Sequence, residues 1–250
     1  MFKQDLAFRT PLMNAAGALG FIPNRRAPFD LGCLGAFVTN PISLAPRQPA
    51  ENRVMLPFAG GFLLHTGLPN PGLRVALKRY AARWRESPIP VLVHLLAGSP
   101  EEAARMVHHL EQFENIAGVE LGFEPQITAE MALARINAVL GELPVIACLP
   151  LERAGDMAQA LAGSGVSAFS LAAGRGILPG PAADGRLVSG RLYGPALLPL
   201  ALAAVQDVAH SGVPVIGSGG VYTSKDAAAM QAAGAVAIQL DAVLWRGGWN

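Results

Sequence analysis

The sequence is poor in charged and aromatic residues. Charged residues make up 15% of the 250-residue chain and aromatic residues 6%, whereas 52% of the residues are hydrophobic. A chain of this composition can bury a large core, which argues against intrinsic disorder. The formal net charge is +1 and the basic runs are short. The composition therefore gives no electrostatic case for binding nucleic acid or an anionic membrane surface.

Cysteine is also scarce, because only Cys33 and Cys148 occur. Two cysteines do not make a disulfide framework, and a reducing cytoplasm is the expected compartment. The N-terminal segment lacks the apolar stretch that a signal peptide needs. The most apolar segment, residues 192–209, contains two prolines and, near its end, a glutamine and an aspartate. We expect it to form a buried helix and not a membrane span.

Short apolar runs alternate with helix-length segments along the chain. Ser99 illustrates this pattern, because it stands as a helix N-cap between an apolar run and a segment that opens with Pro100 and two acids. Continuous apolar strands separated by helices predict a parallel sheet covered by helices. The expected strands are residues 12–17, 35–40, 90–98, 118–123, 144–150, 167–174, 214–220 and 235–244. The expected helices are residues 100–113, 127–142, 152–165, 192–209 and one that begins at Ser224.

Eight such strands in 250 residues predict an α/β fold, a (β/α)8 TIM barrel, as a single domain over residues 1–250. A doubly wound sheet is the alternative. Residues 174–194 are rich in glycine and proline, and we expect a loop or small hairpin there over the barrel mouth.

The chain leaves little room for a closing helix after its last expected strand. Only WRGGWN follows residue 244, so the C-terminal helix of a barrel would be truncated. We expect the outer face of that strand to be exposed beside Trp245 and Trp249. Exposed aromatic residues beside an uncovered strand predict an interface, with a homodimer or a partner subunit to cover it.

Two glycine- or proline-rich segments are candidates for ligand contact. Residues 65–72, HTGLPNPG, combine prolines with glycines and predict a loop of fixed shape. Gly217, Gly219 and Gly220 leave backbone N–H groups bare just before the helix at Ser224. Such a nest at a helix N-terminus attracts a phosphate or another small anion, although a tight strand-to-helix turn alone would also explain it.

Several motifs together resemble the dihydroorotate dehydrogenase family. They are NAAGALG, GAFVTNPISLAPR, TGLPNPG, VEL, GRLYGPALLP and PVIGSGGVYTSKDAAAMQAAGAVAIQL, in this order and over nearly the whole chain. The resemblance implies an FMN-dependent oxidoreductase of pyrimidine synthesis on a (β/α)8 barrel, which oxidises dihydroorotate to orotate. It also implies that Asn70 belongs to the loop that shapes the substrate site. The flavin contacts that it implies are Ala15, Ala16, Gly17, Asn40, Gly194, Gly217, Gly219 and Gly220.

Other positions depart from the family pattern. The resemblance places a flavin-contacting lysine at Asn40 and a second lysine at Cys148. It places asparagines at Leu64, Gly122 and Ala172, a serine at Tyr193, and a Gly-Thr pair that completes the phosphate site at Asp241 and Ala242. Neutral groups thus replace both lysines, and the Asp241 carboxylate would repel a flavin phosphate.

The residues offer no clear catalytic base. The family carries a Cys or Ser on a long loop after its fourth strand, but here GFEPQITAE leads almost directly into a helix. Proton abstraction needs a base within about 3 Å of the carbon acid, and Glu124 and His65 are the weak candidates. We expect His94 to be a hydrogen-bonded core residue, and Arg175 and Arg186 to be able to hold an anion over the mouth.

The sequence therefore leaves two functions open. One is a divergent flavoprotein oxidoreductase that is not active on dihydroorotate. The other is a non-catalytic barrel, a pseudoenzyme that acts as a binding or assembly module and takes a small molecule or anion at its mouth. No local spacing of histidine, cysteine and acidic residues predicts a metal site.

Overall fold

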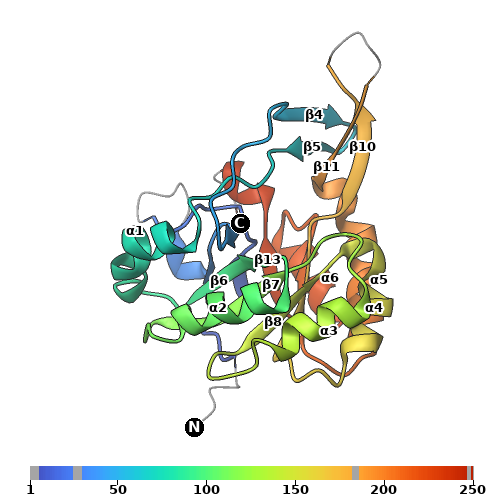
Figure 1. Ribbon diagram of the computed structural model, residues 1–250. Coiled ribbons are helices and arrows are strands. Elements are labelled where there is room, and N and C mark those ends of the chain that lie inside the picture. The colour runs from blue at the N-terminus through green and yellow to red at the C-terminus, as the bar shows by residue number, and fades with distance from the viewer. Residues whose placement is uncertain (1–5, 25–29, 182–185, 247–248, 250) are drawn as a thin grey trace.

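Eight parallel strands form the wall of a barrel in the computed structural model, which describes residues 6–24, 30–181, 186–246 and 249 (Figure 1). Their order is β1-β13-β12-β9-β8-β7-β6-β2, and a backbone bridge between Met13 and Ala36 joins β1 to β2. All eight predicted strands are confirmed, and the closed order excludes the doubly wound sheet. The strands are β1 (Leu12–Asn14), β2 (Phe37–Val38), β6 (Val91–Leu96), β7 (Ile116–Gly122), β8 (Val145–Leu149), β9 (Ala168–Leu171), β12 (Val215–Ser218) and β13 (Ala235–Leu240); β3 (Ile42–Ser43) also pairs with β6.

Helices cover the outside of this wall, and their caps follow from the sequence. The Ser99 hydroxyl accepts the Glu102 N–H at 3.2 Å, and Thr223 and Asp226 form a reciprocal capping box. The helices are α1 (Leu73–Arg85), α2 (Pro100–Leu110), α3 (Ala129–Asn137), α4 (Ala154–Leu161), α5 (Leu198–Ala209) and α6 (Ser224–Ala232). Among the described helices, none has both the length and the apolar character that a membrane crossing requires.

The barrel interior is layered. Successive residues of a strand face opposite sides, so positions two apart share the interior. One apolar layer consists of Met13, Ala36, Val38, Leu92, Ile146, Ala168, Ile216 and Ala237. Two residues further along their strands stand His94, Cys148, Ser170 and Gln239, which are all buried. The interior is therefore apolar at one level and polar at the level nearer the carboxyl ends of the strands, where barrel active sites lie.

A second sheet of four antiparallel strands projects from the barrel (Figure 1). Its order is β10 (Arg175–Pro179), β11 (Leu187–Tyr193), β5 (Gly61–His65) and β4 (Val54–Phe58). The hairpin expected within residues 174–194 is confirmed as β10 and β11, although residues 182–185 lie outside the described part. The β4–β5 hairpin could not be predicted from the sequence, because Pro57 interrupts the apolar pattern. Proline is tolerated there because β4 is an edge strand.

The outer face of β13 is not exposed, contrary to expectation. All its residues are buried except Val236, because β1 and β12 flank the strand and α5 and α6 pack against it. After β13 the described chain continues as the short 3-10 helix η4 (Ala242–Arg246). Trp249 packs against the core, whereas Trp245 is 44% exposed.

The loop TGLPNPG is fixed by the side chain of Asn70. Its Oδ1 accepts hydrogen bonds from the backbone N–H of Ser43 at 3.1 Å, from the Ser43 hydroxyl at 3.1 Å and from the Gly72 N–H at 3.0 Å. Its Nδ2 donates to the carbonyl of Leu68 at 3.2 Å, and Leu68 has a positive φ of 56°. The Asn70 amide thus holds the loop between β5 and α1 in one shape and ties it to β3, with Leu68 held at the barrel mouth.

Replacing Asn70 by alanine is expected to destabilise the protein by about 2–4 kcal/mol, because the buried N–H groups of Ser43 and Gly72 would lose their acceptor. Urea unfolding of the variant and of the wild type measures this difference. The exposed Asn52 is the matched control, and Asn52→Ala should change the unfolding free energy by less than about 0.5 kcal/mol. Equal effects of the two substitutions would contradict the role given to Asn70.

Candidate functional site

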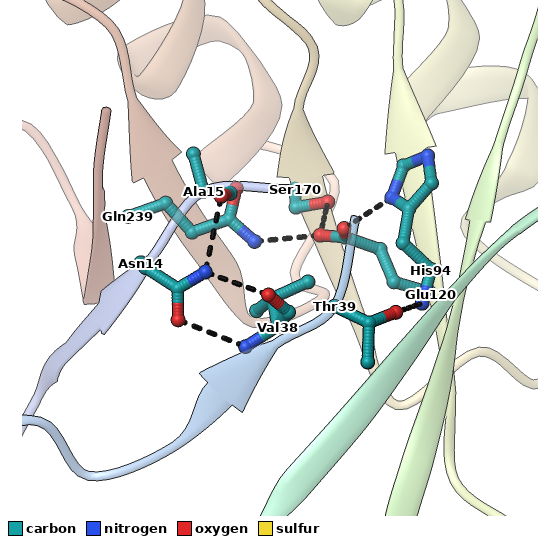
Figure 2. Close-up of polar contacts among 8 residues, drawn as sticks. All are labelled: Asn14, Ala15, Val38, Thr39, His94, Glu120, Ser170 and Gln239. Atoms are coloured by element: carbon teal, nitrogen blue, oxygen red, sulfur yellow. Dashed lines mark hydrogen bonds and ion pairs between the residues drawn. The ribbon is translucent and has the colours of Figure 1, made fainter. Parts of the chain in front are cut away.

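Side chains from three strands converge on one buried carboxylate, that of Glu120 on a fourth strand, β7 (Figure 2). The Nδ1 atom of His94 lies 2.6 Å from Glu120 Oε2. Glu120 Oε1 accepts hydrogen bonds from the Ser170 hydroxyl at 2.7 Å and from Gln239 Nε2 at 2.6 Å. Glu120 is 1% exposed, so these three groups provide the solvation that water would otherwise give.

Glu120 is ionised in this arrangement. Desolvation by burial raises the pKa of its carboxyl, but the hydrogen bond and charge of His94 and the hydrogen bonds of Ser170 and Gln239 outweigh it and hold the pKa below its usual value. An ionised carboxylate can only accept hydrogen bonds, so the proton between the two side chains belongs to Nδ1 of His94. The tautomer of His94 therefore follows from the charge of Glu120.

Further polar contacts hold the same level of the barrel where β1 meets β2. Asn14 Nδ2 donates to the carbonyl of Val38 at 2.6 Å, and its Oδ1 accepts the Val38 N–H at 3.0 Å (Figure 2). The Thr39 hydroxyl accepts the backbone N–H of His94 at 3.1 Å. One backbone bridge joins β1 to β2. The two hydrogen bonds of the Asn14 amide to Val38 therefore contribute much of the contact that closes the barrel.

Two neighbouring cavities open at the barrel mouth. One, of about 260 Å³, is lined by Gly122, Glu124 and Ala172 among others. The other, of about 380 Å³, is lined by residues that include Ala16, Gly17, Asn40, Leu64, His65, Tyr193 and Trp245. The structure thus brings four of the predicted site residues, Ala16, Gly17, Asn40 and His65, to one cavity.

Both cavities share the side chains of Arg47, Arg175 and Arg191. Arg175 and Arg191 are cross-strand neighbours on β10 and β11, whereas Arg47 follows β3. Within the described residues no carboxylate forms an ion pair with any of the three. Glu124 and Glu152 also line the smaller cavity, whereas the described lining of the larger one contains no acidic residue, so the positive charge is concentrated at the larger cavity.

Arg191 also reaches the interior beside Cys148 and Tyr193. Burial raises the pKa of the Cys148 thiol and Glu120 raises it further, whereas the Ser170 hydrogen bond and the Arg191 charge act against them. Burial likewise raises the pKa of Tyr193, while the charge and hydrogen bond of Arg191 lower it. Cys148 therefore remains a buried neutral thiol, and Arg191 lies between the cavities and the polar layer.

Other predicted flavin contacts lie outside these two cavities. Gly217, Gly219 and Gly220 are buried, and a Cβ added at Gly220 would lie 2.3 Å from the backbone nitrogen of Leu198. A Cβ at Gly194 would similarly lie 2.3 Å from the Gly60 carbonyl oxygen. Ala15 donates its backbone N–H to the Leu240 carbonyl at 2.7 Å. These backbone segments are packed against the protein itself.

Glu124 is held by a charged partner. Its carboxylate pairs with Arg135 at 2.6 Å, and the buried Arg135 also donates to the Gly98 carbonyl at 2.9 Å. This ion pair fixes the turn after β7. It also means that Glu124, one of the two candidate bases, already has a charged partner. In the described residues no group of three or more histidine, cysteine or acidic side chains is arranged to hold a metal ion.

Asp241 is a buried carboxylate at the end of β13. It is 4% exposed, and its Oδ1 accepts the backbone N–H of Ala242 at 2.5 Å. Burial raises its pKa to about 6, although the backbone hydrogen bonds of Ala242 and of Asp241 itself act to lower it. The N–H that the family resemblance assigns to the phosphate site is thus already taken by an aspartate.

Sequence reasoning identified His94 as a hydrogen-bonded core residue but missed Glu120, Ser170 and Gln239. A local signal existed, because each of these residues, like His94, is the one polar side chain within an apolar strand segment. The segments are VLVHLL for His94, GVEL for Glu120, AFSL for Ser170 and AIQL for Gln239. The individual strand sequences do not show which of these side chains meet inside the barrel.

Comparison with known proteins agrees with this architecture. A sequence model of the family described as dihydroorotate dehydrogenase matches residues 3–134 and 182–250. The chain belongs to the dihydroorotate dehydrogenase family. The unmatched residues 135–181 include β8 and β9, where Cys148 and Ala172 stand at positions that carry a lysine and an asparagine in the family pattern.

Individual relatives cover nearly the whole chain. Two proteins named dihydroorotate dehydrogenase B (NAD(+)), catalytic subunit, are 30% identical: that of Trichlorobacter lovleyi over 94% of this chain and 84% of its own, and that of Pyrococcus abyssi over 98% and 87%. The crystal structure of DHODH from Eimeria tenella in complex with ferulenol superposes with a TM-score of 0.76. It covers 97% of this chain and 78% of its own at 17% identity, and so supports the fold.

Asp241→Asn is expected to favour the folded state more at high pH than at low pH. The folded-state pKa of Asp241 is raised, so the cost of its buried charge is small at pH 4.5 and full at pH 8. Relative to wild type, the variant should gain about 2 kcal/mol of unfolding free energy between these two pH values. Urea unfolding at both values measures this, with the exposed Asp207→Asn as control. A pH-independent difference would show that folding does not raise the pKa of Asp241.

Proposed function

We propose that the protein binds a small organic anion at the barrel mouth. The observation that carries this proposal is the shared lining of both cavities by Arg47, Arg175 and Arg191. Guanidinium groups recognise carboxylate, sulfate and phosphate through paired N–H donors. Three of them line two neighbouring cavities, and within the described residues none of the three is ion-paired with a carboxylate, which favours an anionic ligand over a neutral one.

We further propose that dihydroorotate is not oxidised by this chain, although its relatives are named for that reaction. Only residues 123–128 separate β7 from α3, and they contain neither serine nor cysteine. Glu124, the acidic residue in this turn, is paired with Arg135. Asn40 and Cys148 supply no positive charge at the two lysine positions. Turnover of dihydroorotate by the purified protein with NAD+ or fumarate would contradict this proposal.

FMN does not fit the phosphate corner as it is built here. The Ala242 N–H is engaged by the buried Asp241 carboxylate, and Gly219 and Gly220 are packed within the protein. A phosphate dianion placed beside this carboxylate would meet a like charge of low exposure, which is unfavourable. The anion proposed for the mouth does not depend on a flavin.

A flavin-dependent oxidoreductase with another substrate is the second candidate. Family membership supports it, and so does the presence of Ala16, Gly17 and Asn40 around one cavity. Bound flavin makes a protein yellow, so the absorbance of the purified protein distinguishes this candidate from a colourless anion-binding barrel.

A second subunit is also part of the proposal. Several relatives are named as a catalytic subunit. In this chain the projecting sheet carries the exposed apolar side chains of Met55, Ile177 and Leu187. A partner subunit or a second copy of the chain would cover them. Light scattering of the purified protein gives its mass and distinguishes a homodimer from a monomer that awaits a partner.

Arg191→Gln is expected to weaken the binding of sulfate and of succinate at least about 10-fold, because it removes a half-buried guanidinium that lines both cavities. Isothermal titration calorimetry at low ionic strength measures the affinities. Arg83→Gln removes an exposed arginine of α1 and serves as the charge-matched control. Unchanged affinity in Arg191→Gln, or equal losses in both variants, would reject a specific site at the mouth.

Asp241→Gly is expected to increase FMN affinity, because it removes the opposing charge and frees the Ala242 N–H. Removing a like charge near a phosphate should improve the dissociation constant at least about 10-fold. Quenching of FMN fluorescence during titration into both proteins measures this. Riboflavin, which lacks the phosphate, is the control ligand and should show no such gain. Tight FMN binding by the wild type would overturn our interpretation of this corner.

A further inference from the structure

The His94–Glu120 pair has the arrangement of a base that is held by a buried carboxylate. Glu120 is ionised and fixed from its other side by Ser170 and Gln239. Its Oε2 accepts the Nδ1 proton of His94 at 2.6 Å. In the neutral ring with its proton on Nδ1, the second ring nitrogen, Nε2, presents a lone pair. Figure 2 shows Nε2 pointing away from Glu120.

This nitrogen lies against Gly122, a residue that lines the smaller mouth cavity, whereas His94 itself is not among the lining residues of either cavity. A Cβ added at Gly122 would lie 2.4 Å from His94 Nε2. The ring therefore occupies space that a side chain at position 122 would take. Between Nε2 and the cavity stands a residue without a side chain, so a small shift of the ring or ligand would bring them together.

Nε2 is also not sealed in the core. Over the described residues, the buried polar side-chain atoms without a hydrogen-bond partner are Arg135 Nε and Ser164 Oγ. Nε2 of His94 is not one of them, and none of the hydrogen bonds found in the described residues uses it. It follows that Nε2 retains some accessible surface, although the side chain as a whole is only 6% exposed.

We propose that His94 is the proton-accepting residue for the anion bound at the mouth, with Glu120 as its positioning residue. This inference rests on the proposed anion site. Nε2 takes a proton from a C–H, N–H or O–H bond of the anion, and the electron pair of that bond stays on the ligand. The imidazolium that forms is paired with Glu120, and Arg191 stabilises the charge on the ligand. The proton returns to the ligand or to solvent, so the step needs no oxidant.

The groups around His94 fit this role. Glu120 on β7 is the negative charge that faces its ring, and Cys148 on β8 remains neutral because burial raises the pKa of its thiol. Thr39, from the segment after β2, contacts only the His94 backbone. Arg191, which reaches Cys148 from β11, is the nearest positive charge that the cavity shares with the polar layer.

NMR of protein labelled with 15N-histidine tests the proposal directly, because the two ring nitrogens of each of the five histidines give separate long-range correlations. Without ligand, we expect the neutral His94 ring to carry its proton on Nδ1 and to have Nε2 bare. Sulfate, the probe anion, should increase the protonated fraction of Nε2 at least twofold. The exposed His108 and His109 should not respond.

Three variants separate this role from a structural one. Arg191→Gln should abolish the response to sulfate, and Glu120→Gln should lower the protonated fraction of Nε2. Gly122→Ala should displace the ring and remove the response while sulfate still binds. Its matched control is Gly98→Ala, at a glycine that lines the same cavity but does not touch His94.

Two results would overturn the inference about His94. One is a ligand-free His94 with its proton on Nε2 and a bare Nδ1. The other is calorimetrically bound sulfate that leaves Nε2 unchanged. In either case the anion site itself stands. A protein that binds no sulfate at all rejects the proposed function, and the proton-accepting role is rejected with it.

Discussion

Burial of the Glu120 carboxylate is the constraint on which the rest of the site depends. A buried charge is tolerated only when hydrogen bonds replace its lost hydration. The three groups that do so come from β6, β9 and β13, so the register of these strands and the charge of Glu120 depend on one another. The same contacts orient His94. A polar network that is fully satisfied in this way also gives the barrel interior one defined arrangement.

The charges at the mouth are unevenly distributed, with the basic side chains on one side and a buried acid on the other. Arg47, Arg175 and Arg191 collect where the projecting sheet meets the barrel, whereas the buried Asp241 lies at the end of β13. In the family pattern the β13 corner receives a phosphate. In this chain an internal carboxylate already takes the Ala242 N–H, and the place with free positive charge is on the side of the arginines. We therefore expect an anion to bind beside the three arginines and not at the β13 corner.

The sequence predicted the wall of the barrel well because each strand is a continuous apolar run with turn residues at its ends. Helix caps such as Ser99 were equally local signals. The β4–β5 hairpin was missed because Pro57 lies in an edge strand whose residues alternate only between exposed and half-buried. The Glu120 network was missed for another reason, since Glu120 and Gln239 are 119 residues apart. Such a contact depends on strand order and register, which no single segment contains.

The departures from the family pattern are matched by local compensation. The space left by a side chain at position 122 is filled by the ring of His94, whose Nε2 lies against Gly122. The backbone N–H at Ala242 is taken by the Asp241 carboxylate. Random loss of function would leave cavities and unpaired polar groups at such positions, at a cost in stability that nothing offsets. At these two positions a new internal partner is present, and one of them is an oriented histidine. Replacement of a lost contact is what a site rebuilt for another ligand requires, and it is consistent with the anion site proposed for the mouth.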